Sequence, residues 1–179
     1  MPSLVPPTVR VRASFLDAMR EFEDEGRGRV TDESMLGDDL RGRWPQWTTV
    51  GGFADYVRDV VADALEDSPR RPGWVPCTTL WYVESDEYLG RLAIRHRLTP
   101  HLLELGGHIG YDVRRSARRQ GHATAMLRAA LPVAAELGID AALLTCDADN
   151  VASRRLIEYN GGVLEDQRGV KLRFWIPTA

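Results

Sequence analysis

The apolar positions in the first half of the chain return twice at helical spacing, with a long polar stretch between the two runs. Residues 8–25 and 53–66 are predicted helices, because apolar side chains recur there every three or four positions. Residues 29–47 are polar and contain glycines, which predicts an ordered loop. Trp44 and Trp47 within this stretch either anchor the loop to the core or help to cover a binding cleft.

The later part of the chain alternates between strand-like and helix-like patterns. Residues 141–146 are apolar nearly throughout, which is typical of a strand in the middle of a covered sheet. Pro132 lies inside a predicted helix that Gly138 ends, so we expect a kink there. The other predicted elements are a short strand at 4–5, a hairpin of strands 78–84 and 88–95, a turn or short helix at 98–105, a strand at 108–113, a helix at 151–159 and a hairpin of 163–165 and 170–176. This order predicts one mixed α/β domain.

Length, charge and cysteine content narrow the classes of function. With 179 residues, of which 44% are hydrophobic and 27% charged, the chain has the size and composition of one globular domain. Its formal net charge of −3 argues against binding nucleic acid or a membrane surface, which usually needs a basic face. No apolar run approaches the ~20 residues of a membrane span, and the first residues do not resemble a signal peptide. Cys77 and Cys146 are too few for a disulfide framework, so we expect reduced thiols and a cytoplasmic location.

The stretch 114–124 carries four arginines and a single glycine between a predicted strand and a predicted helix. Backbone N–H groups at a helix N-terminus are free to bind an anion, and arginine side chains add charge-assisted hydrogen bonds. No Gly-Lys-Ser/Thr follows the glycine, so the segment is not a P-loop. One glycine also stands where the dinucleotide fingerprint needs three. The segment therefore predicts a site for a phosphate-bearing small molecule of another kind.

Within that stretch, Arg118-x-x-Gly121-x-Ala123 resembles the acetyl-CoA signature of the GNAT superfamily of N-acetyltransferases, Gln/Arg-x-x-Gly-x-Gly/Ala. The resemblance extends in order from Thr78 to Glu165. Asn150-Val151-Ala152-Ser153 followed by Gly161-Gly162 looks like a later element of the family. Gly-Gly-His-Ile-Gly-Tyr before the signature and Leu-Thr-Cys-Asp-x-Asp-Asn after it are similar to a bacterial subgroup of predicted acetyltransferases.

The resemblance implies the fold and the cofactor. It implies a single N-acetyltransferase domain over residues 1–179, with a cofactor-binding core at about 78–165. The implied fold is α/β, with a mixed central sheet whose splayed strand pair is flanked by helices. Acetyl-CoA would be the cosubstrate, and no metal is implied. The cofactor-binding residues would be the backbone of Tyr111 and Val113 for the acetyl and pantetheine groups, Arg118, Arg119, Gln120, Gly121, His122, Ala123 and Thr124 around the pyrophosphate, and Asn150 at the thioester end, where it also suits a helix N-cap.

Acetyl transfer to an amine requires a neutral amine, a stabilised thioester oxygen and a proton for the leaving thiolate. His108 is the candidate base, because it starts the signature strand and imidazole titrates near neutral pH. The alternative for His108 is a structural hydrogen bond within the sheet. Glu84 and Asp86, at the end of a neighbouring strand, are further candidate bases, or else part of a solvated turn.

The candidate acid is less well placed. Many family members carry a tyrosine seven residues after the asparagine, where this chain has Ile157. Tyr159 lies two residues further on, which rotates a helical side chain by ~200°, so we expect it to face elsewhere. Tyr111 is the alternative, with packing as its competing role. His96, His101 and His108 match no compact metal motif.

These features predict an acetyl-CoA-dependent N-acetyltransferase that transfers the acetyl group directly to a primary amine. The alternative is a non-catalytic acyl-CoA-binding sensor or regulatory module, because neither the base nor the acid is fixed by the sequence. The acceptor is expected to be a small-molecule amine or a protein or peptide amine, and the protein a monomer or homodimer. The identity of the acceptor and the length of the natural acyl group do not follow from the sequence.

Overall fold

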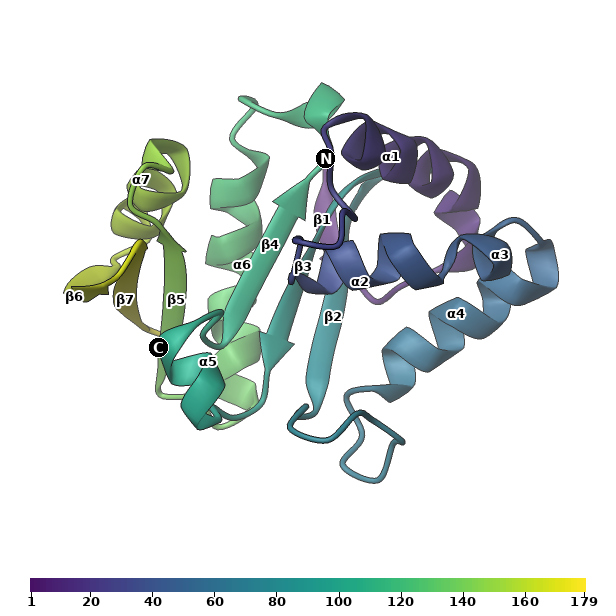
Figure 1. Ribbon diagram of the computed structural model, residues 1–179. Coiled ribbons are helices and arrows are strands. Elements are labelled where there is room, and N and C mark those ends of the chain that lie inside the picture. The colour runs from purple at the N-terminus through teal and green to yellow at the C-terminus, as the bar shows by residue number, and fades with distance from the viewer.

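Two sheets lie side by side in the computed structural model, which describes residues 1–179 (Figure 1). Neighbouring strands run antiparallel within each sheet. The first sheet has the order β1 (Ser3–Val5), β2 (Cys77–Glu84), β3 (Glu87–Arg95) and β4 (Ile109–Val113). The second has the order β5 (Ala141–Asp147), β7 (Lys171–Pro177) and β6 (Val163–Arg168). β4 and β5 are therefore the edge strands at which the two sheets meet.

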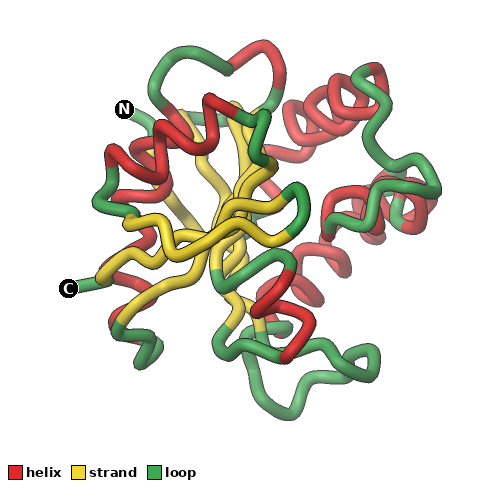
Figure 2. Tube along the Cα trace, turned by 60° about the vertical axis from the view of Figure 1, so that its left-hand side comes forward, coloured by secondary structure: helices red, strands yellow, loops and turns green.

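Helices lie on both sides of the strands (Figure 2). Ser34 caps α2 (Met35–Gly42) by accepting a hydrogen bond from Gly37 N at 3.0 Å, and Leu36 and Leu40 of this helix are buried. The prediction of a loop over residues 29–47 was therefore wrong for most of that stretch: its glycines obscured a short amphipathic helix. The helices are η1 (Val9–Val11), α1 (Arg12–Asp24), α2 (Met35–Gly42), α3 (Trp44–Trp47), α4 (Val50–Ala62), α5 (Pro100–Glu104), η2 (Arg115–Ala117), α6 (His122–Glu136) and α7 (Val151–Tyr159).

The remaining elements follow the predicted order, and the predicted α/β fold is confirmed. The central strands begin and end within a residue of the expected positions. The second amphipathic helix begins at Val50 and ends at Ala62, several residues earlier than the pattern suggested. α6 continues through Pro132 as far as Glu136. None of the helices has the length and apolar character needed to cross a membrane.

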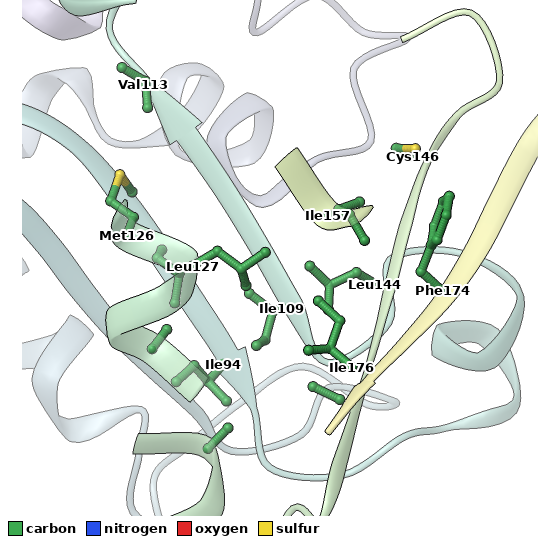
Figure 3. Packing of buried hydrophobic residues seen from close by; sticks show 14 of the residues in the cluster. Ile94, Ile109, Val113, Met126, Leu127, Leu144, Cys146, Ile157, Phe174 and Ile176 are labelled. Carbon is green, nitrogen blue, oxygen red and sulfur yellow. The ribbon is translucent and has the colours of Figure 1, made fainter. Parts of the chain in front are cut away.

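One hydrophobic cluster joins the two sheets beneath α6 and α7 (Figure 3). Met126 and Leu127 of α6 share it with Ile109 of β4, Leu144 of β5 and Ile157 of α7, and all five side chains are almost completely buried. Apolar burial of this kind contributes roughly 1.5–3 kcal/mol per large side chain. The cluster therefore holds β4 and β5 in one molecule although they belong to separate sheets.

A second, aromatic cluster lies on the opposite face, beneath α1 and α4. Phe15 is at its centre, with its ring stacked on Trp81 at 5.1 Å and edge-on to Trp47 at 5.1 Å. Trp47 is fully buried, so this tryptophan anchors its segment to the core, as one of the two sequence interpretations proposed. This cluster fixes α1, α3 and α4 on the first sheet and leaves the α1–α2 connection above β3 and β4.

Candidate active site

β4 and β5 are joined at one end by His108, the residue that precedes β4. Its backbone N–H donates to Leu143 O at 2.7 Å, and its ring Nδ1 accepts from Leu143 N at 2.9 Å. The imidazole thus occupies the place of a backbone carbonyl in a strand pair. The preceding residue, Gly107, lies so close to β5 that a Cβ there would be 2.3 Å from Leu143 O. Gly107 and His108 together form the joint between the two sheets.

Beyond this joint the strands diverge (Figure 1), and one backbone edge of β4 faces the gap. Arg95 N donates to His108 O at 2.8 Å, and Arg114 N donates to Leu89 O at 2.9 Å. Because the bonds to one neighbour alternate along an antiparallel strand, the N–H and C=O groups of residues 109, 111 and 113 point away from β3. This edge has the geometry to pair with an extended chain.

The basic loop that follows β4 presents a cluster of free backbone N–H groups. Arg119 and Gly121 have left-handed backbones, with φ of 62° and 82°. Gly121 is the N-cap of α6 and provides no side-chain cap, and the backbone N–H groups from Arg119 to Thr124 have no acceptor within the protein. Successive N–H groups in such a turn, at the positive end of a helix dipole, form a concave site for an anion.

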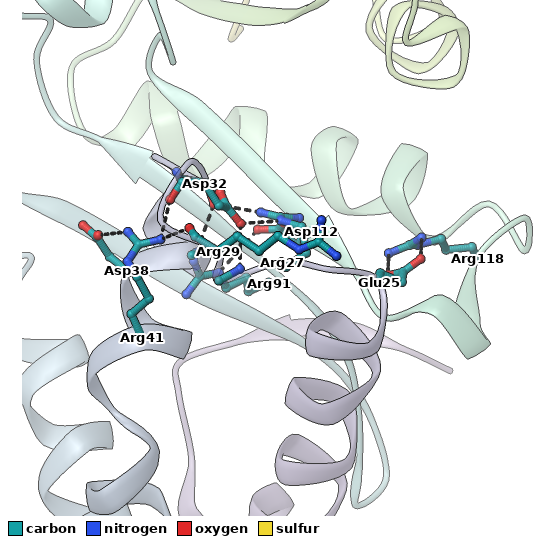
Figure 4. Close-up of polar contacts among 12 residues, drawn as sticks. Glu25, Arg27, Arg29, Asp32, Asp38, Arg41, Arg91, Asp112 and Arg118 are labelled. Carbon is teal, nitrogen blue, oxygen red and sulfur yellow. Dashed lines mark hydrogen bonds and ion pairs between the residues drawn. The ribbon is translucent and has the colours of Figure 1, made fainter.

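Two of the four arginines in this loop form ion pairs within the protein, and the other two have free side chains. Arg114 is buried and binds Glu21 Oε1 at 2.5 Å and Tyr88 O at 3.2 Å. Arg118 donates through Nε to Val113 O at 2.9 Å and pairs through both other nitrogens with Glu25 (Figure 4). These pairs fix the loop against α1 and occupy both guanidinium groups. The side chains of Arg115 and Arg119 are exposed and free to meet a ligand.

A cavity of about 750 Å³ opens over β3, β4 and the end of β5. Its floor is made of small residues, Ala93 and Gly110, which pair directly across β3 and β4. Its other walls come from the α1–α2 connection, Trp74 and α5. The cavity also includes Tyr111, Cys146, Asp147, Asn150 and Ser153, so it reaches the gap between the diverging strands.

Two hydroxyl groups meet across that gap. Tyr111 OH of β4 lies 2.5 Å from Ser153 Oγ of α7. Burial raises the pKa of Tyr111, so its hydroxyl stays protonated at neutral pH. Asn150 caps α7 by accepting from Ser153 N at 3.1 Å and also lines the cavity. Both interpretations of Asn150, as a cap and as a site residue, are therefore compatible with its position.

A smaller hollow of about 310 Å³ lies beside the basic loop, between α6 and α7. Gly121, Thr124, Ala125, Arg128 and Tyr159 line it. Tyr159 is 71% exposed, and the guanidinium of Arg128 lies 5.6 Å from the centre of its ring. Ile157, by contrast, is fully buried, as the helical rotation between these two positions predicts.

The three predicted catalytic residues are not brought together. Tyr159 lies in the smaller hollow, outside the cavity between the strands. Glu84 is the last residue of β2 and pairs with the amino group of Met1 at 3.1 Å, whereas the cavity contacts Cys77 at the start of that strand. Asp86 pairs with Arg10 at 3.2 Å. His108 is at the joint and is not part of the cavity wall. These positions favour structural or surface roles for Glu84, Asp86 and His108.

The role of His108 is tested by replacing it with asparagine, whose side-chain oxygen can accept the Leu143 N–H in place of Nδ1. Burial, reinforced by the charge of Arg95, lowers the pKa of His108 to about 4 from its ordinary value of 6.5. The neutral, buried imidazole therefore contributes its full share to the free energy of unfolding above pH 6.5. This contribution decreases as the pH falls towards 4, by up to about 3 kcal/mol. We expect His108→Asn to lose this part of the pH dependence of unfolding, measured by chemical denaturation between pH 7.5 and 4, and to keep most of its kcat.

A folded His108→Asn variant with unchanged cofactor affinity but a kcat lowered about a hundredfold or more would instead identify His108 as the base.

Sequence reasoning missed the Ser153 hydroxyl and the cations of the cavity. Ser153 belongs to the Asn150–Ser153 motif, but its hydroxyl partner, Tyr111, is 42 residues away in the chain, so local sequence does not reveal the pair. Arg91 and Arg95 are four residues apart on one strand, and this even spacing is a signal that both side chains share one face. No group of three or more histidine, cysteine, aspartate or glutamate side chains is arranged to hold a metal ion.

The family follows from a comparison with known proteins. A model of the GNAT acetyltransferase domain matches residues 18–163, which is most of the chain. The chain therefore belongs to the GNAT acetyltransferase family, as its motifs suggested. A search of curated proteins found no match.

Solved structures with the same fold are acetyltransferases of several kinds. RimJ from Mycobacterium smegmatis, in complex with a CoA disulfide, has a TM-score of 0.66 and 18% identity, covering 98% of this chain and 81% of that chain. The microcin C7 self-immunity acetyltransferase MccE, in complex with acetyl-CoA and AMP, has a TM-score of 0.65 and 12% identity, covering 98% and 92%. RimL, a ribosomal L7/L12 α-N-protein acetyltransferase in complex with coenzyme A, has a TM-score of 0.62 and 16% identity, covering 97% and 92%. At these identities the similarity establishes the shared fold.

Proposed function

We propose that the protein is an acetyl-CoA-dependent N-acetyltransferase that transfers the acetyl group directly to a primary amine. The observation that carries the proposal is the continuity between two sets of free backbone groups. The N–H groups from Arg119 to Thr124 form an anion site, and the free edge of β4 leads from that site to the cavity. A pyrophosphate followed by an extended amide-containing arm matches both sets in order.

The residues of this path fit coenzyme A. Nothing lies within 4 Å of a Cβ built on Gly121, so the backbone there is open to a phosphate. The pantetheine arm would add to the edge of β4 through the backbone of Tyr111 and Val113, where the Val113 N–H is free and the Val113 C=O also accepts from Arg118 Nε. The exposed ring of Tyr159 and the guanidinium of Arg128 suit the adenine and a phosphate of the adenosine. Tyr159 would then bind the cofactor and not supply a proton.

Acetyl-CoA supplies an activated thioester, and the chain supplies the groups that complete the transfer. The N–H of Tyr111 would stabilise the negative charge that develops on the acetyl carbonyl oxygen when the amine attacks its carbon. The hydroxyl groups of Ser153 and Tyr111 provide a proton for the departing thiolate, because both remain protonated at neutral pH. Among the carboxylates of the cavity wall, Glu33 forms no salt bridge and is free to accept the amine proton, whereas His108 lies outside the wall and its Nδ1 accepts from Leu143 N.

Removing the Ser153 hydroxyl tests the acid step. We expect Ser153→Ala to lower kcat by about tenfold to a hundredfold, because one donor to the leaving group is lost. The dissociation constant for acetyl-CoA should change less than about threefold, and Ser153→Thr, which keeps a hydroxyl, should restore most of the rate. Steady-state thiol release and calorimetry measure the two quantities. An unchanged kcat in Ser153→Ala would remove Ser153 from the mechanism.

The proposed function is tested by titrating the protein with acetyl-CoA and then measuring thiol release with a panel of amines. Binding together with amine-dependent thiol release supports the enzyme. Binding without turnover on any amine supports the alternative, an acyl-CoA-binding sensor. Absence of binding would refute both. RimL acts on the α-amine of a protein and MccE confers immunity to microcin C7, so the panel should contain both peptide α-amines and small amines.

A further inference from the structure

The charges around the main cavity are almost fully paired within the protein. Arg27 binds Asp32 at 2.8 Å and Asp112 at 3.0 Å (Figure 4). Arg91 binds Asp39 at 2.8 Å, and Lys171 binds Asp147 at 2.7 Å. Two charged side chains of the wall are left without a salt bridge. They are the cation Arg95 and the carboxylate of Glu33.

Arg95 presents an uncompensated positive charge to the cavity. Its Nη1 donates to the carbonyls of Gly106 and Gly107, at 3.2 Å and 3.1 Å, and its Nε and Nη2 have no partner in the protein. The side chain is largely buried, and this burial lowers the pKa of Arg95. A partly desolvated guanidinium without a counter-charge is unfavourable by itself and is relieved by an anion. Nε and Nη2 together form the donor fork that binds a carboxylate in a bidentate manner.

The position of Arg95 relates this charge to the reacting atoms. A Cβ built on Gly110 would lie 3.9 Å from Arg95 Nη1, so the guanidinium lies beside Gly110 on the cavity floor. The next residue is Tyr111, whose N–H faces the gap, and successive residues of a strand are only ~3.3 Å apart. An anion bound by Arg95 would therefore be within a few ångströms of the acetyl group.

We propose that Arg95 binds a carboxylate of the acceptor, and that the acceptor is an amino acid or a similarly small compound whose carboxylate lies close to its amine. This proposal rests on the proposed function and adds the substrate class. A free amino acid brings a carboxylate for Arg95 and holds its amine close to that carboxylate, beside Gly110 and Tyr111. The N-terminus of a protein has no carboxylate at that distance from its amine, so it fits the charge pattern less well.

The test uses matched pairs of acceptors: amino acids and their primary amides, assayed by thiol release with acetyl-CoA. In the wild type we expect the preferred amino acid to exceed its amide at least about tenfold in kcat/KM. Arg95→Gln retains a donor for the Gly106 and Gly107 carbonyls but lacks the charge. It should lower kcat/KM for the amino acid by about tenfold to a hundredfold, mainly through KM, and leave the amide nearly unchanged. The matched control is Arg97→Gln, which changes an exposed arginine two residues beyond the end of the same strand. Arg97 pairs with Glu66, and this variant should keep the wild-type preference.

Three outcomes would overturn the proposal. The first is a wild-type preference for amides, cationic amines or peptides, which would leave the proposed function intact and remove the carboxylate site. The second is an equal loss of rate for acids and amides in Arg95→Gln, which would show that Arg95 only holds the Gly106–Gly107 turn. Thiol release with no member of the panel, while acetyl-CoA still binds, would refute the amino acid class together with the enzymatic function. Calorimetry with acetyl-CoA on each variant separates these results from a failure of the cofactor site.

Discussion

Gly121→Asp is expected to abolish measurable binding of acetyl-CoA, whereas Gly138→Asp is expected to leave it nearly unchanged. Both glycines have left-handed backbones, with φ of 82° and 80°, and neither has any atom within 4 Å of a built Cβ. The strain of an L-residue, about 1–2 kcal/mol, is therefore common to the two variants. Gly121, however, begins α6 at the proposed pyrophosphate site, and Gly138 follows the other end of the same helix.

The difference between the two variants isolates the anion site. A carboxylate at position 121 repels a pyrophosphate and competes for the N–H groups of the first turn, so we expect the dissociation constant to rise at least about a hundredfold. Calorimetry measures the affinity, and thermal unfolding verifies that both variants fold with similar stability. Equal affinities of the two variants would show that the loop does not hold the cofactor.

Gly107→Ala is expected to destabilise the protein far more than Gly106→Ala. The two neighbouring glycines both have positive φ, 97° at Gly106 and 61° at Gly107. A Cβ at Gly106 would contact a flexible leucine atom at 3.4 Å, but at Gly107 it would be 2.3 Å from the backbone oxygen of Leu143. We expect a loss of about 1–2 kcal/mol for Gly106→Ala and about 3–5 kcal/mol for Gly107→Ala, since a backbone clash adds to the strain.

Gly107→Ala is also expected to change the activity. Relieving the clash at Gly107 moves β5 away from β4 at the joint, which changes the width of the gap that starts there. Thiol-release rates measured at a temperature where Gly107→Ala is folded should therefore be lowered, while those of Gly106→Ala should match the wild type. Similar unfolding free energies for the two variants, measured by denaturant titration, would show that the close approach of the two sheets is not required.

The backbone of the loop before α6 could be predicted from the sequence because it depends on local geometry. Gly121, at the start of an amphipathic helix, marks a left-handed N-cap whatever the rest of the fold does. The strands could also be predicted, because a strand covered on both faces has a continuous apolar run and a strand covered on one face has an alternating pattern. The family signature added the expectation that the strand before the loop has a free edge.

The catalytic residues were less predictable because they depend on contacts between distant segments. The pairing of Glu21 with Arg114 and of Glu25 with Arg118 joins residues that are more than 90 positions apart in the chain. The joint made by His108 requires Leu143, 35 residues later. Whether Arg95 is neutralised depends on which carboxylates the helices of the N-terminal half bring to the cavity. Such information appears only when the chain is folded.

The most direct test of the central claim is to follow isotopically labelled acetyl from acetyl-CoA by mass spectrometry in the presence of a mixture of amines. The account predicts labelled N-acetyl product and free CoA in equal amounts, with no acetyl group retained on the protein. Gly121→Asp should form neither product at the same cofactor concentration. Cofactor that binds without forming any N-acetylated product, or label that remains on the protein as an intermediate, would contradict direct transfer to an amine.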